Sequence, residues 1–210
     1  KERNGFKLDV PYAEKLMMDL MFEMNNIESE LQSIFPPIVE ERWSEKTGKQ
    51  LKDKVTVFNP GSRKQIAERL QGLGVKFDKK TEKGNIIVDE KVLEGIDRPE
   101  AKAVAHYMML QKRVAQIDSW LKAVKDDGRV HGRVVTNGAV TGRMTHQSPN
   151  MAQVPAVSAP FGTECRSCWT VDEGNVLVGI DASGLELRML AHYMDDDDYT
   201  NEILNGDIHT

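Results

Sequence analysis

The sequence predicts an α+β fold in which a helical part, residues 1–128, precedes a sheet-based part, residues 129–210. Two long segments of the first part carry apolar residues at three- and four-residue steps, the spacing of an amphipathic helix. After the turn sequence Asp126-Asp127-Gly128, the chain changes to short β-branched runs broken by glycine and proline. The composition, 40% apolar and 29% charged, is that of a globular protein and argues against a disordered chain.

The first long helix is predicted over residues 10–35. Asp9 stands directly before Val10-Pro11, and proline in the first turn is typical of a helix start. Phe35-Pro36-Pro37 ends the pattern because proline lacks the backbone donor that a helix interior needs. The apolar stripe of this helix comprises Leu16, Leu20, Met24, Ile27, Leu31 and Ile34.

Residues 36–57 are polar, and we expect a solvated connector there. Their lysines also admit a second interpretation, a loop that contacts phosphates, but we favour the solvated loop because charged runs usually face water. These lysines are Lys46, Lys49, Lys52 and Lys54.

Two further helices are predicted over residues 62–73 and 99–125. Ser62 is a good N-cap for the shorter helix, and Pro99 opens the longer one. Between the two helices, residues 75–89 are broken by glycine and predict a small hairpin or loop.

The longer helix carries several cations on its outer face, among them Lys112 and Arg113. These cations either keep that face soluble or contact a charged partner. Charge spacing alone does not separate the two interpretations.

In the second part, short strands are predicted on either side of Thr136-Asn137-Gly138, a hairpin signal. Two more strands are predicted over residues 165–170 and 175–181. Helices follow over residues 185–194 and 199–205. We expect the run of four aspartates, Asp195 to Asp198, to form a solvated loop, because consecutive side chains cannot all point at one metal ion.

The apolar run Val176–Ile180 ends in Asp181, which predicts a carboxylate at the C-terminal end of a strand covered on both faces. Such a carboxylate is a good ligand for a hard divalent cation. The alternative is that Asp181 caps the following helix and Glu186 is an ordinary surface residue. Spacing alone leaves both interpretations open.

The only cysteines are Cys165 and Cys168, in a Cys-x-x-Cys sequence. A zinc site would need two more ligands at suitable spacing, and no second pair is present. A redox pair usually lies at a helix N-terminus in a βαβ unit, which the sequence does not indicate. We therefore expect two buried thiols in a reducing cytoplasm.

The net charge of −5 excludes a protein that is basic overall, so nucleic-acid binding would need locally clustered lysines and arginines. No apolar run approaches the ~18 residues of a membrane span, and no signal peptide is evident. We expect a cytoplasmic protein. Because the first residue is Lys1, we expect the sequence to begin inside a larger coding sequence or to have been trimmed.

The run from Asp181 to Arg188, Asp-Ala-Ser-Gly-Leu-Glu-Leu-Arg, resembles motif A of the family A DNA polymerases. The resemblance is strongest to the replicative polymerases of short-tailed, T-seven-like phages, and it extends from about Gly5 to Thr210. Several ordered motifs at family-like separations are more specific than any one of them. The other matching motifs are Phe58–Ser62, Thr141-Gly142-Arg143, Pro149–Pro155 and Gly206–Thr210.

The resemblance implies that residues 1–128 form a thumb, which grips the primer–template, and that residues 129–210 form the first part of a palm. It implies two Mg²⁺ ions, with Asp181 as the first carboxylate ligand and the backbone carbonyl of Ala182 as a further ligand. Glu186 matches the residue that packs under the incoming sugar and excludes a 2′-hydroxyl, so the implied product is DNA.

The resemblance also implies contacts with primer–template DNA and with the incoming nucleotide. Arg143 matches an arginine that reaches the minor groove, where every base pair presents acceptors. The resemblance makes Lys112 and Arg113 candidates for contacts with the DNA backbone. Arg166 matches a basic position near the triphosphate, and His209 one near the nucleotide. Further DNA contacts are implied for Asn150, Gln153 and, more weakly, Arg188, whereas we favour a structural role for His192.

The sequence also departs from the family pattern. It lacks the nucleotide-binding helix that should follow Thr210, the second catalytic carboxylate and the carboxylates of a 3′–5′ exonuclease. Asp181 alone cannot hold two ions, so we expect the chain to be inactive without a second polypeptide or the remainder of a longer chain. The connector over residues 36–57 is too short for most of the insertion that captures thioredoxin, so we do not expect that partner.

Three functional classes follow from these observations. The favoured one is part of a DNA-directed DNA polymerase, either one subunit of a split phage enzyme or a fragment. The rival is a non-catalytic DNA-binding or assembly subunit with a polymerase-like fold, against which the presence of Asp181, Glu186 and Arg143 argues. A hydrolase that uses Asp181 with His192 is disfavoured because no nucleophile motif accompanies them.

Overall fold

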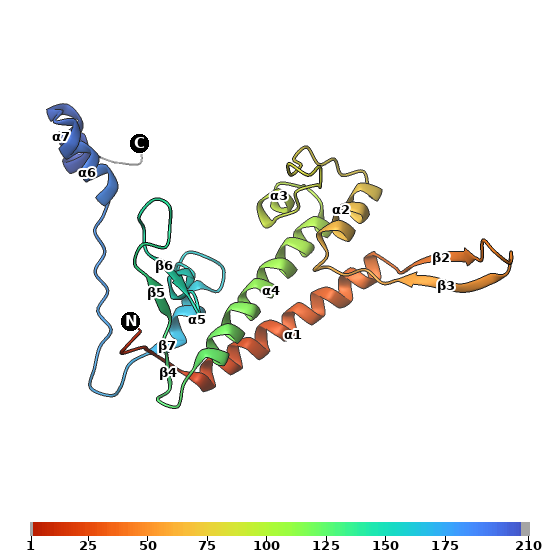
Figure 1. The fold of residues 1–210 in the computed structure, drawn as a ribbon, viewed down its shortest axis with the longest axis horizontal. Coiled ribbons are helices and arrows are strands. Elements are labelled where there is room, and N and C mark those ends of the chain that lie inside the picture. The colour runs from red at the N-terminus through yellow and green to blue at the C-terminus, as the bar shows by residue number, and fades with distance from the viewer. Residues whose placement is uncertain (1, 207–210) are drawn as a thin grey trace. The chain divides into compact units, whose positions relative to one another are not determined.

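The computed structural model describes residues 2–206 (Figure 1). The chain divides into two compact units, residues 1–170 and residues 171–210, which are described separately below. Residues 129–170 pack with the long helices in the first unit. The division into a thumb, residues 1–128, and a palm, residues 129–210, concerns function and stays a prediction.

Two long antiparallel helices, α1 (Val10–Ile34) and α4 (Pro99–Ala123), lie side by side and form the frame of the first unit (Figure 1). Asp9 caps α1, because its Oδ1 accepts a hydrogen bond of 3.0 Å from the backbone N–H of Tyr12. Proline occupies the first turn of both helices, as the sequence predicts. Their bounds agree with the predicted helices over residues 10–35 and 99–125.

Apolar side chains along the two helices fill two cores. Leu31 of α1 and Val104 of α4 belong to the first core, which extends under the connecting segments. Leu20 of α1 and Trp120 of α4 belong to the second core, which also contains Cys165. Burial of these apolar stripes, rather than helix propensity, supplies most of the stability of such helices.

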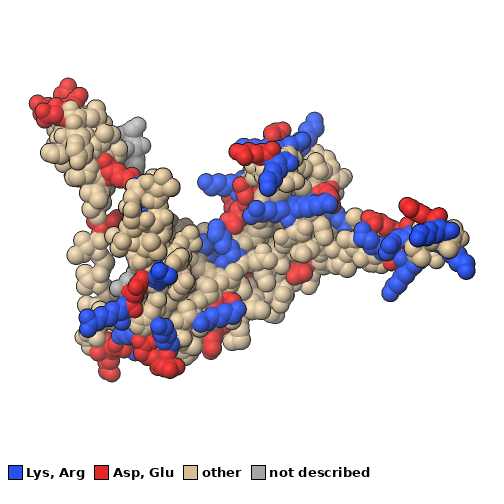
Figure 2. Space-filling model, viewed as in Figure 1, with Lys and Arg blue, Asp and Glu red and all other residues tan. Residues whose placement is uncertain are grey.

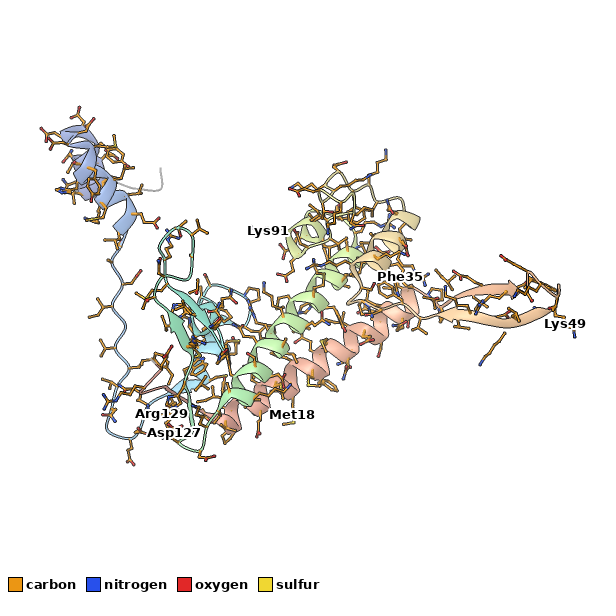
Figure 3. All side chains as sticks on the ribbon, viewed as in Figure 1. Met18, Phe35, Lys49, Lys91, Asp127 and Arg129 are labelled. Atoms are coloured by element: carbon orange, nitrogen blue, oxygen red, sulfur yellow. The ribbon has the colours of Figure 1, made fainter. Side chains whose placement is uncertain are left out.

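Residues 38–56 form a β-hairpin of β2 (Ile38–Trp43) and β3 (Gln50–Thr56). The prediction of a loop without regular secondary structure is therefore wrong. The register pairs Val39 with Val55 and Glu40 with Lys54, whose Nζ lies 3.0 Å from a Glu40 carboxylate oxygen. The solvation was predicted correctly, since nearly every hairpin residue is exposed. Figure 2 shows basic and acidic side chains interspersed over the hairpin, and Figure 3 shows Lys49 at its tip.

A short helical segment follows the hairpin. Helix α2 (Arg63–Gly72) begins after Ser62, whose side chain accepts from the backbone N–H of Gln65, as expected of an N-cap. An isolated antiparallel bridge joins Lys80 to Ile86 within the predicted hairpin or loop. Helix α3 (Glu90–Glu94), capped by Asp89, is too short to give a periodic sequence signal.

Small sheets complete the first unit. Strands β4 (Arg129–Val130), β1 (Phe6–Leu8) and β7 (Trp169–Thr170) form an antiparallel sheet in that order. Strands β5 (Arg133–Val135) and β6 (Thr145–Gln147) form the predicted hairpin on either side of residues 136–144.

The strand predicted over residues 165–170 is wrong for most of its length. Helix α5 (Gly162–Ser167) occupies the region, and only Trp169 and Thr170 pair as a strand. Cys165 and Cys168 are both buried in the second core. Their spacing of three residues brings both to one face of a helical turn, whereas a strand would place them on opposite faces.

The second unit contains helices α6 (Leu185–Met194) and α7 (Asp197–Asn205), which pack through the buried Ala191 and Ile203. The strand predicted over residues 175–181 is wrong: no strand is present between residues 171 and 206. Val176 is 81% exposed and Ile180 is 94% exposed. A strand needs a neighbouring strand to bond its backbone groups, and no strand of the described residues pairs with this run.

The aspartate run is also not the predicted loop. The Asp196 carboxylate accepts from the backbone N–H of Tyr199 at 2.9 Å, and Asp197 and Asp198 occupy the first turn of α7. Carboxylates at a helix N-terminus are favoured by the helix dipole. Among residues 2–206, no helix is both long and apolar enough to cross a membrane.

Candidate functional site

Four of the predicted DNA-contacting residues line one surface pocket of the first unit. Lys112 and Arg113 reach it from α4, and Asn150 and Gln153 reach it from the irregular segment after β6. The pocket has a volume of about 540 Å³, and Gln116 and Trp120 contribute to its lining. The structure therefore brings together residues that are about 40 positions apart in the sequence.

The segment over residues 149–160 contains one short turn of 3₁₀ helix, Met151–Gln153, and no strand. Asn150 caps that turn, because its Oδ1 accepts from the backbone N–H of Ala152 at 3.1 Å. Gln116 Nε2 of α4 donates to the carbonyl oxygen of Gln153 at 2.6 Å. The side chains of Asn150 and Gln153 thus stand on a backbone that α4 holds directly.

Two arginines also donate to carbonyls of this segment. Arg113 Nε lies 3.1 Å from the Pro160 oxygen, and Arg166 Nε of α5 lies 2.8 Å from the Pro155 oxygen. The resemblance implies that Arg113 contacts the DNA backbone and that Arg166 contacts the triphosphate. In this structure, each uses one of its donors on the protein backbone.

Arg143 lies in the loop between β5 and β6 and is exposed. It does not line the pocket that contains Asn150 and Gln153. The loop is closed by the Ala139 N–H, which donates to the Arg143 oxygen at 3.1 Å, and by Gly142 with a φ of 76°. A positive φ is costly for residues with a side chain, which explains the glycine at that position.

The motif that contains Asp181 lies in the second unit. Asp181, Ala182 and Glu186 are all exposed, with Glu186 in the first turn of α6. The N-cap of α6 is Gly184, with a φ of 60° and no side-chain cap. The alternative interpretation of Asp181 as a helix cap is therefore wrong.

Arg188 is held by the backbone of the same turn, since its Nε donates to the Ser183 oxygen at 2.9 Å. Arg188 and His192 line a pocket of about 320 Å³ between α6 and α7. The His192 ring lies 5.6 Å from that of Tyr193. His209, predicted near the nucleotide, lies outside the described residues.

The donor set around Asp181 does not fit two magnesium ions by itself. Over residues 2–206, no three side chains of His, Cys, Asp or Glu converge as metal ligands would. A divalent ion in a nucleotidyl-transfer site needs several oxygen ligands, and two ions need bridging carboxylates. Asp181 can supply only part of such a set.

The two cysteines have the environment of structural thiols. Both are free and fully buried. Burial raises the pKa of Cys165, and burial together with the nearby Cys165 and Asp9 raises the pKa of Cys168 to about 12. A thiol with a raised pKa is a poor nucleophile and a poor metal ligand, which agrees with the expected buried thiols.

The sequence does not single out Gln116 as a site residue. It is neutral, so a search for clustered cations passes over it. Its position four residues after Lys112 would have placed it on the same face of the helix. Only the structure shows that the segment over residues 149–160 packs against that face.

Comparison with known proteins agrees with the resemblance. A model of DNA polymerase family A matches residues 38–210. The chain is 48% identical over 175 residues to the DNA-directed DNA polymerases of Escherichia phage T7 and Enterobacteria phage T3, covering 73% of this chain and 25% of each relative. DNA polymerase I of Helicobacter pylori is 30% identical over 215 residues, or 99% of this chain and 21% of that protein. The chain thus spans about a quarter or less of these relatives.

A solved structure has the same fold. It is the POL domain of Pol1 from M. smegmatis in complex with DNA primer-template and dNTP, with a TM-score of 0.75 and 23% identity. The match covers 97% of this chain and 33% of that one. It confirms a mixed α+β fold that corresponds to part of a polymerase domain. The chain therefore belongs to DNA polymerase family A.

Proposed function

We propose that this chain is part of a DNA-directed DNA polymerase and binds primer–template DNA through its first unit. The observation that supports this most is the pocket in which Lys112, Arg113, Asn150 and Gln153 come together in a family A chain. Cations suit the phosphate backbone, and amide side chains suit the acceptors of the minor groove. In this proposal, residues 1–128 act as a thumb and residues 129–210 as the first part of a palm.

The proposed reaction is template-dependent transfer of a nucleotide onto a primer 3′-hydroxyl. Asp181 and the backbone carbonyl of Ala182 supply one part of the ligand set for Mg²⁺. We expect the second carboxylate ligand from outside this chain, because Asp181 alone cannot hold two ions. We therefore expect the chain alone to bind DNA without extending it.

Further roles are proposed for residues around this centre. Glu186 excludes a 2′-hydroxyl from the incoming sugar, and Arg143 contacts the minor groove at the primer terminus. Arg188 and His209 are assigned to DNA and to the nucleotide, respectively. Arg166 is the predicted triphosphate contact. Exposure of Arg143 and Glu186 supports these assignments, because a group that meets a ligand must be accessible.

The proposed partners are primer–template DNA, a dNTP and the polypeptide that supplies the rest of the palm and the fingers. That polypeptide is a second subunit of a split phage polymerase or the remainder of one long chain. The DNA and dNTP in the M. smegmatis Pol1 complex support the first two partners. We expect no thioredoxin partner, and we expect the protein to work in the host cytoplasm.

The test is magnesium-dependent primer extension by the chain alone and by the chain mixed with the polypeptide encoded downstream. We expect extension only in the mixture, and Asp181→Asn should abolish it while leaving primer–template affinity within about twofold. Unchanged extension by Asp181→Asn, or tight DNA binding with no extension in any mixture, would instead support the rival proposal of a non-catalytic DNA-binding subunit. Asp172→Asn, on an aspartate outside the motif, is the matched control.

A further inference from the structure

The irregular segment over residues 149–160 raises the question of what fixes its backbone. Apart from one 3₁₀ turn, it has no helix or strand to satisfy its carbonyl oxygens. Three of these oxygens accept hydrogen bonds from side chains instead. The donor–acceptor pairs are Gln116 Nε2 to Gln153 at 2.6 Å, Arg166 Nε to Pro155 at 2.8 Å and Arg113 Nε to Pro160 at 3.1 Å.

The donors stand on two helices that the second core holds in place. Gln116 and Arg113 come from α4, in which the neighbouring Ile117 is fully buried. Arg166 comes from α5, next to the fully buried Cys165. The three contacts therefore attach a segment without regular structure to two well-packed helices.

We propose that Arg113, Gln116 and Arg166, here called the carbonyl clamp, are positioning residues that hold Asn150 and Gln153 at the DNA-binding pocket. This inference rests on the proposed function, because it concerns the same pocket. It assigns Arg166 the task of holding the backbone at Pro155 in place of a direct contact with phosphate. Arg166 acts on DNA only through the segment that it holds, whereas Arg113 also lines the pocket and keeps its proposed contact with the DNA backbone.

The chemistry of arginine distinguishes the two roles. A phosphate contact depends mainly on charge, so lysine can replace arginine in part. A hydrogen bond from Nε to a carbonyl depends on the rigid planar guanidinium, which lysine lacks. Arg166→Lys should therefore be almost as harmful as Arg166→Met if Arg166 is a clamp residue, and much less harmful if it contacts phosphate.

The first readout is hydrogen–deuterium exchange of the full chain without DNA. In Arg166→Lys, Arg166→Met and Gln116→Met, we expect the backbone amides of residues 150–162 to exchange several-fold faster, while α1 is unchanged. Gln116→Met keeps the length of a half-buried side chain outside both cores and removes the donor, so it tests the clamp without changing the core. Arg42→Lys and Arg42→Met, in the exposed β2 strand, are the matched controls. Unchanged exchange in residues 150–162 would overturn the clamp.

The second readout is the affinity for a primer–template duplex as a function of salt. Substitution of Gln116 or Arg166 should lower the affinity by about tenfold without changing the slope of log K against log[salt], because no phosphate contact is lost. A slope whose magnitude falls by about 0.9 in Arg166→Met but not in Arg166→Lys would assign Arg166 to the DNA backbone and overturn the clamp for that residue. If the unmodified chain does not bind DNA, the proposed function fails, and the exchange experiment still decides whether the clamp exists.

Discussion

Trp120 of α4 and Trp169 of β7 meet edge to face, with ring centroids 5.1 Å apart and an angle of 67° between the planes. Trp120 is 1% exposed and lies in the second core. Aromatic pairs in this geometry add about 0.5–1.5 kcal/mol to the stabilisation from buried area. The contact joins the long helix to the sheet that includes β1, so it ties together segments from three regions of the sequence.

Trp120→Ala should lower the free energy of unfolding by about 3–5 kcal/mol, because it leaves a large cavity and removes the aromatic pair. Trp43→Ala is the matched control: Trp43 is 57% exposed in the hairpin, and its loss should change stability by less than about 0.5 kcal/mol. Urea denaturation of both variants measures the difference. Similar losses in the two would show that Trp120 is not a core residue.

Gly162 should not tolerate a side chain. A Cβ at this position would lie 1.8 Å from the Ala156 carbonyl oxygen, a backbone atom that can move only with its segment. Gly162→Ala should therefore destabilise the protein by about 1–3 kcal/mol. Gly72→Ala, near the end of α2 with no atom within 4 Å of its Cβ position, should be neutral or slightly stabilising. Thermal unfolding of the pair provides the comparison, and equal melting temperatures would contradict the prediction.

The contact between Asp127 and His131 should make stability depend on acid pH. His131 Nε2 lies 2.8 Å from an Asp127 carboxylate oxygen, and this hydrogen bond holds the pKa of Asp127 below its ordinary value. A carboxyl with a lowered folded-state pKa stabilises the fold above its unfolded pKa of about 3.9 and loses that contribution as pH falls through the folded pKa.

Asp127→Asn should accordingly reduce the loss of unfolding free energy below about pH 4. Between pH 5 and pH 7, the unfolding free energy of the variant should depend on pH about as weakly as that of the parent. The measurement is urea denaturation at a series of pH values. Asp53→Asn, on an exposed aspartate of the hairpin, should reproduce the parent profile. If both variants lose unfolding free energy at acid pH as the parent does, the Asp127–His131 contact does not contribute to the pH dependence of stability.

Both cysteines should resist alkylation in the folded protein. They are fully buried, and a pKa of about 12 for Cys168 leaves only about one molecule in 10⁴ with a Cys168 thiolate at about pH 8. Iodoacetamide should label neither residue in the native protein and both in about 8 M urea, as read by intact mass. Rapid native labelling would indicate an exposed or activated thiol and would revive the redox interpretation.

The long helices were predictable because their signals are local and repeated. Asp9 and Pro11 mark the start of α1, and an apolar stripe marks its buried face. The hairpin at residues 38–56 was not predictable in the same way, since its strands expose both faces and show no clear apolar–polar alternation. Helix α5 was missed because six residues are too few to establish a helical period.

The sequence allowed several of the pocket residues to be identified one by one, but not the fact that they line one pocket. Lys112, Arg113, Asn150 and Gln153 were each identified through the resemblance, and the structure brings them together. Gln116 was not identified, because its role depends on which backbone packs against α4. Tertiary contacts of this kind leave no mark on local sequence periodicity. The catalytic roles of Asp181 and Glu186 stay predictions, and Asp181→Asn tests the first of them.

The exposed run Val176–Ile180 has a practical consequence for handling this chain. It is a short, uncharged stretch of β-branched residues, leucine and one glycine, without proline, the type of sequence that adds strands from other molecules. Within the part of the chain that the structure describes it pairs with no strand, and its four large apolar side chains are exposed. Purified chain should therefore form aggregates that bind thioflavin at high concentration, and Val178→Lys should delay their appearance without disturbing either helical core.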